Sequence, residues 1–378
     1  MQNLKPMGAV AALYAEDQHD LTEAIVASLS RAIFHGNDPK PANKSKIFVG
    51  RVSHRIVRWT TTASASKDGH AVTLYRNPLF ERSGHPYARS LLTSSRSETV
   101  ALVEGGDPMN GPYMMLSPEI RFNSGLWDRI FFESVQSKDV QLRFMLETQA
   151  TYNAAKRVLD RGESARIKAV AAGTGLSLIL AYDRLIREGY DPQSITAVIT
   201  DRDPDNIAKA NRLLAKLAST RIHHNVPGHA YGIFAMPEDV FDGPDPLATA
   251  LHVPYHIVTA IGILEYFQGV SHGTTEQRLM LHEPEEPVTA QDLAAQLAAM
   301  TTDRGNLIIN TYRDHACIRI LELFGKRFDF RDRGHLRELL EPLNFRSFHL
   351  AGSGHIYDVE VFEKSASAMP MPSPRPEM

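Results

Sequence analysis

The chain has 378 residues, of which 43% are hydrophobic, and a formal net charge of -3. That length allows two domains, or one elaborated domain with a sizeable core. The lack of a basic surplus argues against a nucleic-acid-binding protein, because such proteins bind phosphates through clustered lysines and arginines. The single cysteine, Cys317, excludes an internal disulfide and a cysteine-rich zinc site.

Long apolar segments are missing from the sequence. It contains no stretch of about 18 apolar residues, the length of a membrane-spanning helix. Its first residues also lack the apolar core of a secretory signal peptide before acidic residues intervene. We therefore expect a cytoplasmic protein with neither a membrane nor a nucleic acid as partner. A homodimer is compatible with the sequence.

The first 137 residues carry weak and mixed patterns. Apolar residues recur at every fourth position over 20–34, which predicts an amphipathic helix. The segment 46–60 fits a helix or a strand, and alternating apolar residues near Val72 and Val100 predict short strands. We expect residues 1–137 to form an α+β cap that shapes the acceptor pocket.

Strands alternating with helices follow from residue 138 onward. A long helix is predicted over 138–160, closed by a glycine. Short apolar runs separated by helical segments then predict buried strands, and this alternation is typical of a mostly parallel sheet covered on both faces. The predicted strands cover 167–172, 195–200, 256–261 and 307–310.

The end of the chain has a different pattern. Two more strands are predicted over 345–350 and 357–364, and the short link between them permits only antiparallel pairing. The tail 366–378 is rich in proline and serine and is predicted to be disordered. The fold class predicted for residues 138–365 is therefore α/β, a Rossmann-like sheet with an antiparallel C-terminal hairpin.

A glycine-containing loop links the first predicted strand to the next helix. It reads Ala172-Gly173-Thr174-Gly175. Glycines at a strand-to-helix turn let the backbone approach a ligand closely. A single Gly-x-Gly is also compatible with an ordinary tight turn, so a second feature is needed.

Acidic residues follow the second predicted strand, in the sequence Asp201-Arg202-Asp203-Pro204. A carboxylate at the carboxyl end of that strand can accept hydrogen bonds from both hydroxyls of a ribose. Asp203 before a proline is typical of a helix N-cap. We therefore predict a ribose-binding role for Asp201 and a structural role for Asp203.

A nicotinamide dinucleotide would use the same two features. Its fingerprint has a third glycine, and Leu178 occupies that position here. The antiparallel final strand also fits poorly with the all-parallel dinucleotide-binding sheet.

The order of these motifs over 138–364 resembles that of the class I S-adenosylmethionine (SAM)-dependent methyltransferase superfamily. The similarity covers, in chain order, the first motif, the acidic second-strand motif, the fourth strand, the fifth strand and the terminal hairpin. The segments are AVAAGTGLS, VITDRDP, HIVTAIGILEYF, GNLIINTY, and the pair FRSFHL and YDVEVFEK.

This resemblance implies SAM as the cofactor and a set of residues that bind it. The glycine loop would contact its methionine part, the acid of the second strand its ribose, and the loop after the third strand its adenine. The residues implied are Ala172, Gly173, Thr174, Gly175, Asp201, Arg202, Met236 and Glu238. We expect Gly262, Glu265 and Tyr266 at the same site, because they follow the strand predicted over 256–261 and ligands bind at the carboxyl ends of strands in open α/β sheets.

The first motif departs from the family pattern. The family carries an acid just before the first glycine, where this chain has Ala171 and Ala172, and the third small residue is Ser177. The methionine ammonium must then be held by other groups, either backbone carbonyls or Glu265.

Methyl transfer requires alignment, and a base where the acceptor is protonated. A sulfonium is a cation without hydrogen-bond donors, so aromatic faces suit it. We name Tyr152, Tyr312 and His315 as catalytic candidates, with His256 as a second base. The pair His223-His224 does not predict a metal site, because adjacent strand residues point to opposite faces.

Three functions are compatible with these features. The first is a small-molecule methyltransferase of biosynthesis. The second is a SAM cyclase that closes the amine of SAM onto its γ-carbon, which gives azetidine-2-carboxylate and methylthioadenosine. The missing acid of the first motif motivates this alternative, because a cyclase needs a free amine. The third is a non-catalytic SAM-fold binding protein.

Overall fold

The computed structural model describes residues 19–36, 116, 135–223, 232–241, 254–267, 288–315 and 329–366. The predictions for 46–60, for the strands near Val72 and Val100, and for the tail from residue 367 lie outside these described residues.

Seven strands form one sheet in the order β3-β2-β1-β4-β5-β7-β6. The first five are parallel, whereas β7 runs antiparallel to β5 and β6. The Rossmann-like sheet with an antiparallel C-terminal hairpin is thereby confirmed. The strands are β1 Ala165–Ala169, β2 Ile195–Asp201, β3 Ile233–Pro237, β4 Tyr255–Ala260, β5 Thr301–Asn310, β6 Phe345–Ser353 and β7 Asp358–Lys364.

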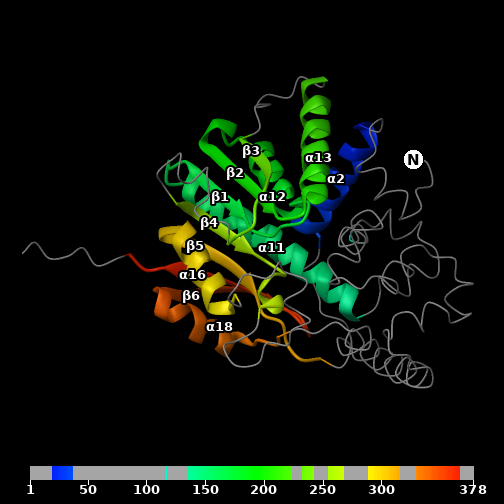
Figure 1. Cartoon of the computed structure of the whole chain (residues 1–378). Helices are drawn as coiled ribbons and strands as arrows, with labels where there is room; N and C mark the ends of the chain where they lie inside the picture. The colour runs from blue at the N-terminus through cyan, green and yellow to red at the C-terminus, as the bar shows by residue number, and fades with distance from the viewer. Residues whose placement is uncertain are drawn as a thin grey trace, which may run out of the picture.

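Helices cover both faces of this sheet (Figure 1). One face packs against α2, α11, α12 and α13 in a continuous apolar core, and the other against α16 and α18 in a second core. The helices are α2 His19–Phe34, α11 Val135–Leu159, α12 Leu176–Arg187, α13 Pro204–His223, α16 Ala290–Met300 and α18 Arg333–Leu340, with short 3-10 turns η1 Pro192–Ser194, η2 Leu264–Tyr266 and η3 Glu341–Leu343.

Strand β1, which lies between β2 and β4, shows why these segments become strands. Ile167 and Ala169 are fully buried, as expected where helices cover both faces of a parallel sheet. No helix among the described residues is long and apolar enough to cross a membrane.

Helix α2 confirms the amphipathic helix predicted over 20–34, and it shares the core of the sheet. Ile25, Leu29 and Ile33 are buried in the same apolar cluster as α11, α12 and α13. This part of the N-terminal region therefore stabilises the Rossmann-like layers directly. The division of the chain at residue 137 and the cap role of the preceding residues stay predictions.

Candidate cofactor site at the carboxyl edge of the sheet

The loop after β1 turns through a left-handed backbone. Ala171, Gly173 and Gly175 have φ angles of 49°, 58° and 64°. The loop is tied to the sheet and to itself by two hydrogen bonds, from the Ala172 N–H to the Thr200 carbonyl (3.0 Å) and from the Gly175 N–H to the Ala172 carbonyl (2.9 Å). A non-glycine residue at positive φ costs free energy, so the surrounding structure holds Ala171 in place.

The two glycines of this loop have different roles. A Cβ at Gly173 would meet no atom within 4 Å, whereas a Cβ at Gly175 would lie 2.5 Å from the Ile199 side chain. Gly175 is therefore required for packing the start of α12 against β2. Only Gly173 faces open space that a ligand can approach. Thr174 between them is buried.

Asp201, the last residue of β2, joins this loop. Its Oδ2 accepts a hydrogen bond from the Gly173 N–H (2.8 Å), and its Oδ1 accepts one from the Asp203 N–H (2.9 Å). Burial raises the pKa of Asp201, and these backbone bonds oppose the rise. Oδ1 of Asp201 also accepts a hydrogen bond from Nδ2 of Asn206 (3.4 Å). A carboxylate has about four lone-pair positions, so Asp201 can still accept one bond from a ribose hydroxyl. Arg202 beside it is exposed.

Asp203 has the structural role that we predicted from its position. Its Oδ1 accepts a hydrogen bond from the Asp205 N–H (2.9 Å) in the first turn of α13.

A buried ion pair lies next to Asp201. Lys168 in β1 has a fully buried side chain, and its Nζ lies 2.8 Å from Oε1 of Glu238. Glu238 follows β3, and its N–H donates to the Asp201 carbonyl (3.0 Å). Its Oε2 is buried without a hydrogen-bond partner among the described residues. This acceptor fits a donor such as an adenine amino group or a ribose hydroxyl.

Met236 was expected in the loop after the third strand, and the structure places it within β3. Lys168 was missed, because a lysine within a short apolar run gives no sign that its side chain is buried.

A polar stripe on α11 crosses the carboxyl edge of the sheet. The stripe consists of Asp139, Arg143 and Glu147, which occupy one face of the helix because they are spaced by four residues. All three side chains are buried. Helix α11 lies beside α12 (Figure 1). Each member of the stripe contacts a different element at this edge.

Glu147 meets the start of α12. Its Oε1 accepts a hydrogen bond from the Ser177 hydroxyl (2.8 Å). Burial raises the pKa of Glu147 to about 7, and the bond from Ser177 and the charge of Arg143 offset only part of that effect. Glu147 is thus a carboxyl beside the glycine loop that changes charge near neutral pH.

Arg143 meets the end of β4. Its Nη1 lies 3.5 Å from Oε1 of Glu265. A Cβ at Gly262 would lie 3.1 Å from the same Nη1, so a glycine at this position lets the guanidinium approach. Glu265 is 4% exposed, burial raises its pKa, and its Oε2 has no partner among the described residues. Tyr266 beside it is partly buried against the second core.

Asp139 meets the turn between β6 and β7. Its Oδ2 accepts a hydrogen bond from the Ile356 N–H (2.5 Å). The rings of His315 and His355 lie 5.9 Å apart at this turn. The structure therefore brings the predicted base His315 next to a second histidine, which sequence reasoning missed because His355 stands outside every motif.

Tyr312 lies in an aromatic cluster beside the stripe. Its ring centroid is 5.2 Å from that of Tyr357 and 5.6 Å from that of Phe330. The Arg143 guanidinium carbon lies 4.5 Å above the centre of the Tyr357 ring. The cluster places aromatic rings at the end of β5, and the carboxyl ends of strands are where ligands bind in open α/β sheets.

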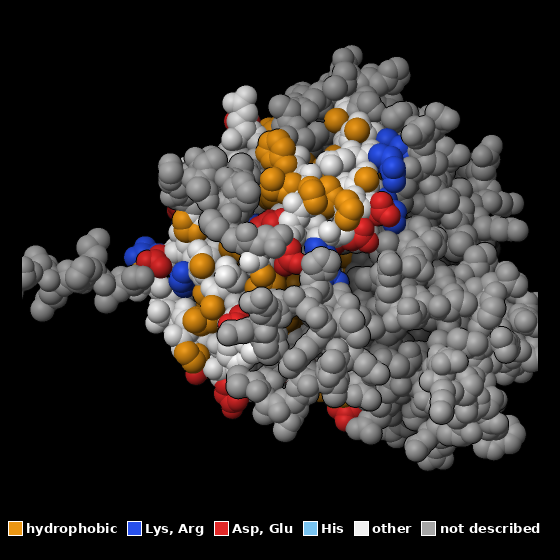
Figure 2. Space-filling model, viewed as in Figure 1, with side chains coloured by type: hydrophobic (Ala, Val, Ile, Leu, Met, Phe, Trp, Pro, Cys, Tyr) orange, Lys and Arg blue, Asp and Glu red, His pale blue; other side chains and the backbone are white. Residues whose placement is uncertain are grey.

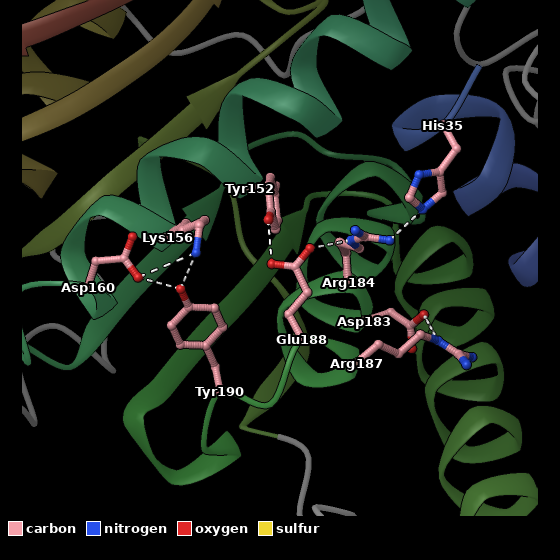
Figure 3. A network of polar contacts seen from close by, with 9 residues as sticks. All are labelled: His35, Tyr152, Lys156, Asp160, Asp183, Arg184, Arg187, Glu188 and Tyr190. Atoms are coloured by element: carbon pink, nitrogen blue, oxygen red, sulfur yellow. Dashed lines mark hydrogen bonds and ion pairs between the residues drawn. The ribbon is translucent and has the colours of Figure 1, made fainter.

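Tyr152 is not brought to this site. Its hydroxyl donates a hydrogen bond to Oε2 of Glu188 (2.5 Å), directly after α12 (Figure 3). The glycine loop is at the opposite end of α12, about 18 Å away at 1.5 Å per residue. Tyr152 belongs instead to a surface network in which Arg184 bonds Glu188 and His35.

His256 is also remote from the loop. It lies at the amino end of β4, where its Nδ1 accepts a hydrogen bond from the Arg166 N–H (3.2 Å), and burial lowers its pKa. Within the described ranges, no group of three or more His, Cys, Asp or Glu side chains is arranged to hold a metal ion.

The strand order, the glycine loop and the acid that ends β2 define a Rossmann-like fold of the class I methyltransferase type. No protein-family model matches the sequence, and no curated protein matches it.

Several solved structures show a distant similarity. One is the magnesium protoporphyrin IX methyltransferase of Synechocystis PCC 6803 with bound S-adenosylhomocysteine (SAH), at 12% identity and a TM-score of 0.38, covering 60% of this chain and 87% of that chain. The N-methyltransferase NodS of Bradyrhizobium japonicum WM9 has 11% identity and a TM-score of 0.34. The similarity covers 58% of this chain and 97% of NodS. The CMeT domain of the citrinin polyketide synthase has 13% identity and a TM-score of 0.41. The similarity covers 94% of this chain and 92% of that domain. At these scores the fold assignment rests on the strand order of the chain itself.

Proposed function

We propose that this protein binds SAM at the carboxyl edge of its sheet and transfers the methyl group to a small molecule. The observation that carries the proposal is the bond from the Gly173 N–H to Asp201, 2.8 Å long, beside a glycine that faces open space. It joins a loop that a ligand can approach to a carboxylate that can bind ribose. The carboxyl edge is also where ligands bind in open α/β sheets.

The residues at this edge fit the chemical groups of SAM. Asp201 and the free Oε2 of Glu238 are acceptors for ribose hydroxyls and for the adenine amino group. The aromatic cluster of Tyr312 and Tyr357 lies at this edge, and aromatic surroundings suit a sulfonium. SAM supplies an activated methyl group, so the protein has to align the acceptor and accept its proton. His315 beside His355 is the candidate base for that proton.

A small acceptor is favoured over a nucleic acid. On the face that Figure 2 shows, lysine and arginine side chains form separate small groups among the described residues and no continuous basic surface. Phosphate backbones require such a surface. The N-terminal region before α11, proposed as a cap, would enclose the acceptor.

The SAM cyclase is the second candidate function, and Glu147 is the observation that favours it. A carboxyl with a pKa of about 7 can accept the proton of the SAM ammonium. The freed amine would then form a bond to the γ-carbon while the bond from that carbon to sulfur breaks. The products are azetidine-2-carboxylate, methylthioadenosine and the proton held by Glu147. The non-catalytic binding protein has no structural observation of its own in its favour.

Binding and turnover experiments test this proposal. Calorimetry should show binding of SAH, and also of methylthioadenosine, which keeps the ribose and adenine. Asp201→Asn should weaken both ligands about tenfold or more, because a charged hydrogen-bond acceptor is lost. Asp203→Asn is the matched control, because asparagine also serves as an N-cap. Wild-type protein that binds neither ligand would refute the proposal.

Incubation with SAM alone separates the candidate functions. A methyltransferase leaves SAM intact until an acceptor is added, whereas a cyclase releases methylthioadenosine without one. A protein that binds SAH, releases no methylthioadenosine from SAM and methylates no member of a panel of acceptors would support the non-catalytic alternative.

A further inference from the structure

A hydrogen bond from Ser177 holds the carboxyl group of Glu147, which comes from helix α11, beside the glycine loop. Ser177 lies in the first turn of α12, directly after that loop, and its hydroxyl donates to Glu147 (2.8 Å). Glu147 is 7% exposed and comes from α11. The loop after β1 carries Ala171 and Ala172 before its first glycine, where it has no acid. Glu147 therefore supplies an acid beside the loop from outside the motif.

Two buried carboxyl groups lie around Arg143, those of Glu147 and Glu265. Arg331 also acts on Glu265, and it lies 2.7 Å from Asp329, whose side chain is 39% exposed. Burial raises the pKa of both Glu147 and Glu265 and so favours their neutral forms. A positive charge brought beside them stabilises the ionised forms, so the cluster favours a cationic ligand.

The α-ammonium of an amino acid has the charge and donors that this cluster lacks. It is compact and carries three N–H donors, like the ammonium of lysine. Oε2 of Glu265 is buried without a partner among the described residues. An adenosine group bound at Asp201 would direct its amino-acid end toward α12 and Glu147, since Asp201 is bonded to Gly173 in the same loop.

We propose that Glu147 of α11 holds the ammonium of the methionine part of SAM, in place of the acid that the first motif lacks. This inference rests on the proposed function. Glu265 and Arg143 complete the amino-acid end of the site. Glu147 is then a binding residue that distinguishes ligands with an amino-acid part from ligands with a nucleoside alone.

Two ligands separate this role from the rest of the site. SAH carries the amino acid, and methylthioadenosine shares its adenosine and thioether but has no ammonium. Glu147→Gln keeps an oxygen for Ser177 and removes only the charge. We expect it to weaken SAH about tenfold to a hundredfold in calorimetry and to leave methylthioadenosine unchanged. Glu163→Gln, at an exposed glutamate paired with Arg161, is the matched control and should change neither affinity.

Each other outcome is decisive. Equal weakening of both ligands by Glu147→Gln, or no weakening of either, overturns the inference while the proposed function stands. Wild-type protein that binds neither ligand overturns both. If Glu147→Gln does not fold, Glu147→Asp keeps the charge on a shorter side chain, and it should weaken SAH while leaving methylthioadenosine unchanged.

Discussion

Lys168 and Glu238 form an ion pair of 2.8 Å in which the lysine side chain is fully buried. The pair joins strand β1 to the residue after β3 and so crosses the intervening strand β2. A buried ammonium is tolerated only when a partner compensates its charge. This relationship fixes Glu238 at the edge of the sheet where we propose that adenosine binds.

Removing one partner of this pair should lower the free energy of unfolding more than replacing both partners with apolar residues. Glu238→Leu removes the carboxylate that lies 2.8 Å from the buried ammonium of Lys168 and should lower the free energy of unfolding by about 3 kcal/mol. The double variant Lys168→Met with Glu238→Leu should recover part of that loss. Urea unfolding measures both values. If the loss in the double variant equals the sum of the losses in Glu238→Leu and Lys168→Met, the two residues are not coupled and the prediction is wrong.

The two loop glycines should respond differently to alanine. Gly175→Ala combines positive φ with a contact of 2.5 Å to Ile199, so it should lower the free energy of unfolding by about 2 kcal/mol or more. Gly173→Ala should cost about 1 kcal/mol for its backbone alone. Gly173→Ala should also weaken the binding of SAH strongly, because the methyl group of the new alanine enters the open space that the ligand would occupy. Unfolding curves and calorimetry test this, and equal stability of the two variants would refute the division of roles.

The pH dependence of stability should reveal Glu147. Burial raises its pKa in the folded protein to about 7, above its ordinary value of 4.5. Between these values the folded protein holds a proton that the unfolded chain releases, so stability falls as the pH rises through this window and levels off above it. In the ligand-free protein, Glu147→Gln should flatten part of this slope. Urea unfolding from pH 4.5 to pH 8 measures it.

Arg143 and Ser177 face this group, Glu265 pairs with Arg143, and all three stay in place in Glu147→Gln. The difference between the two proteins therefore isolates Glu147, although burial raises the pKa of Glu265 as well. Parallel stability curves for variant and wild type would show that Glu147 does not titrate in this range. The affinity for SAH should show the opposite trend and rise between pH 6 and pH 8 in the wild type.

Tyr152→Phe should leave the affinity for SAH unchanged, because Tyr152 bonds Glu188 at the far end of α12. The loss of one hydrogen bond at the surface should lower the free energy of unfolding by about 1 kcal/mol or less. Tyr312→Phe is the comparison at the site itself. A large loss of SAH affinity in Tyr152→Phe with unchanged stability would place Tyr152 back at the site.

Six of the seven strands could be predicted from the sequence because each contains a short apolar or alternating run. Strand β3 was not among them, because it lies at the edge of the sheet and only its first residue is buried. The loop at Gly173 and the acid Asp201 followed from that order. The α11 stripe could not be predicted, because the long helix contains many polar residues and its periodicity does not show which of them are buried. Tyr152 was misplaced for the same reason. It lies on the same helix as Glu147, but it lies beside the other end of α12.

The stripe on α11 also sets a strict requirement on chain length. An α-helix turns about 100° and rises 1.5 Å with each residue, so one inserted residue between Asp139 and Glu147 would rotate one end away from its partner. Either Ser177 would lose the carboxyl of Glu147, or Ile356 would lose that of Asp139. Insertions and deletions should therefore be excluded from this span of about 12 Å. Substitutions that keep the helical phase should be tolerated on its other faces.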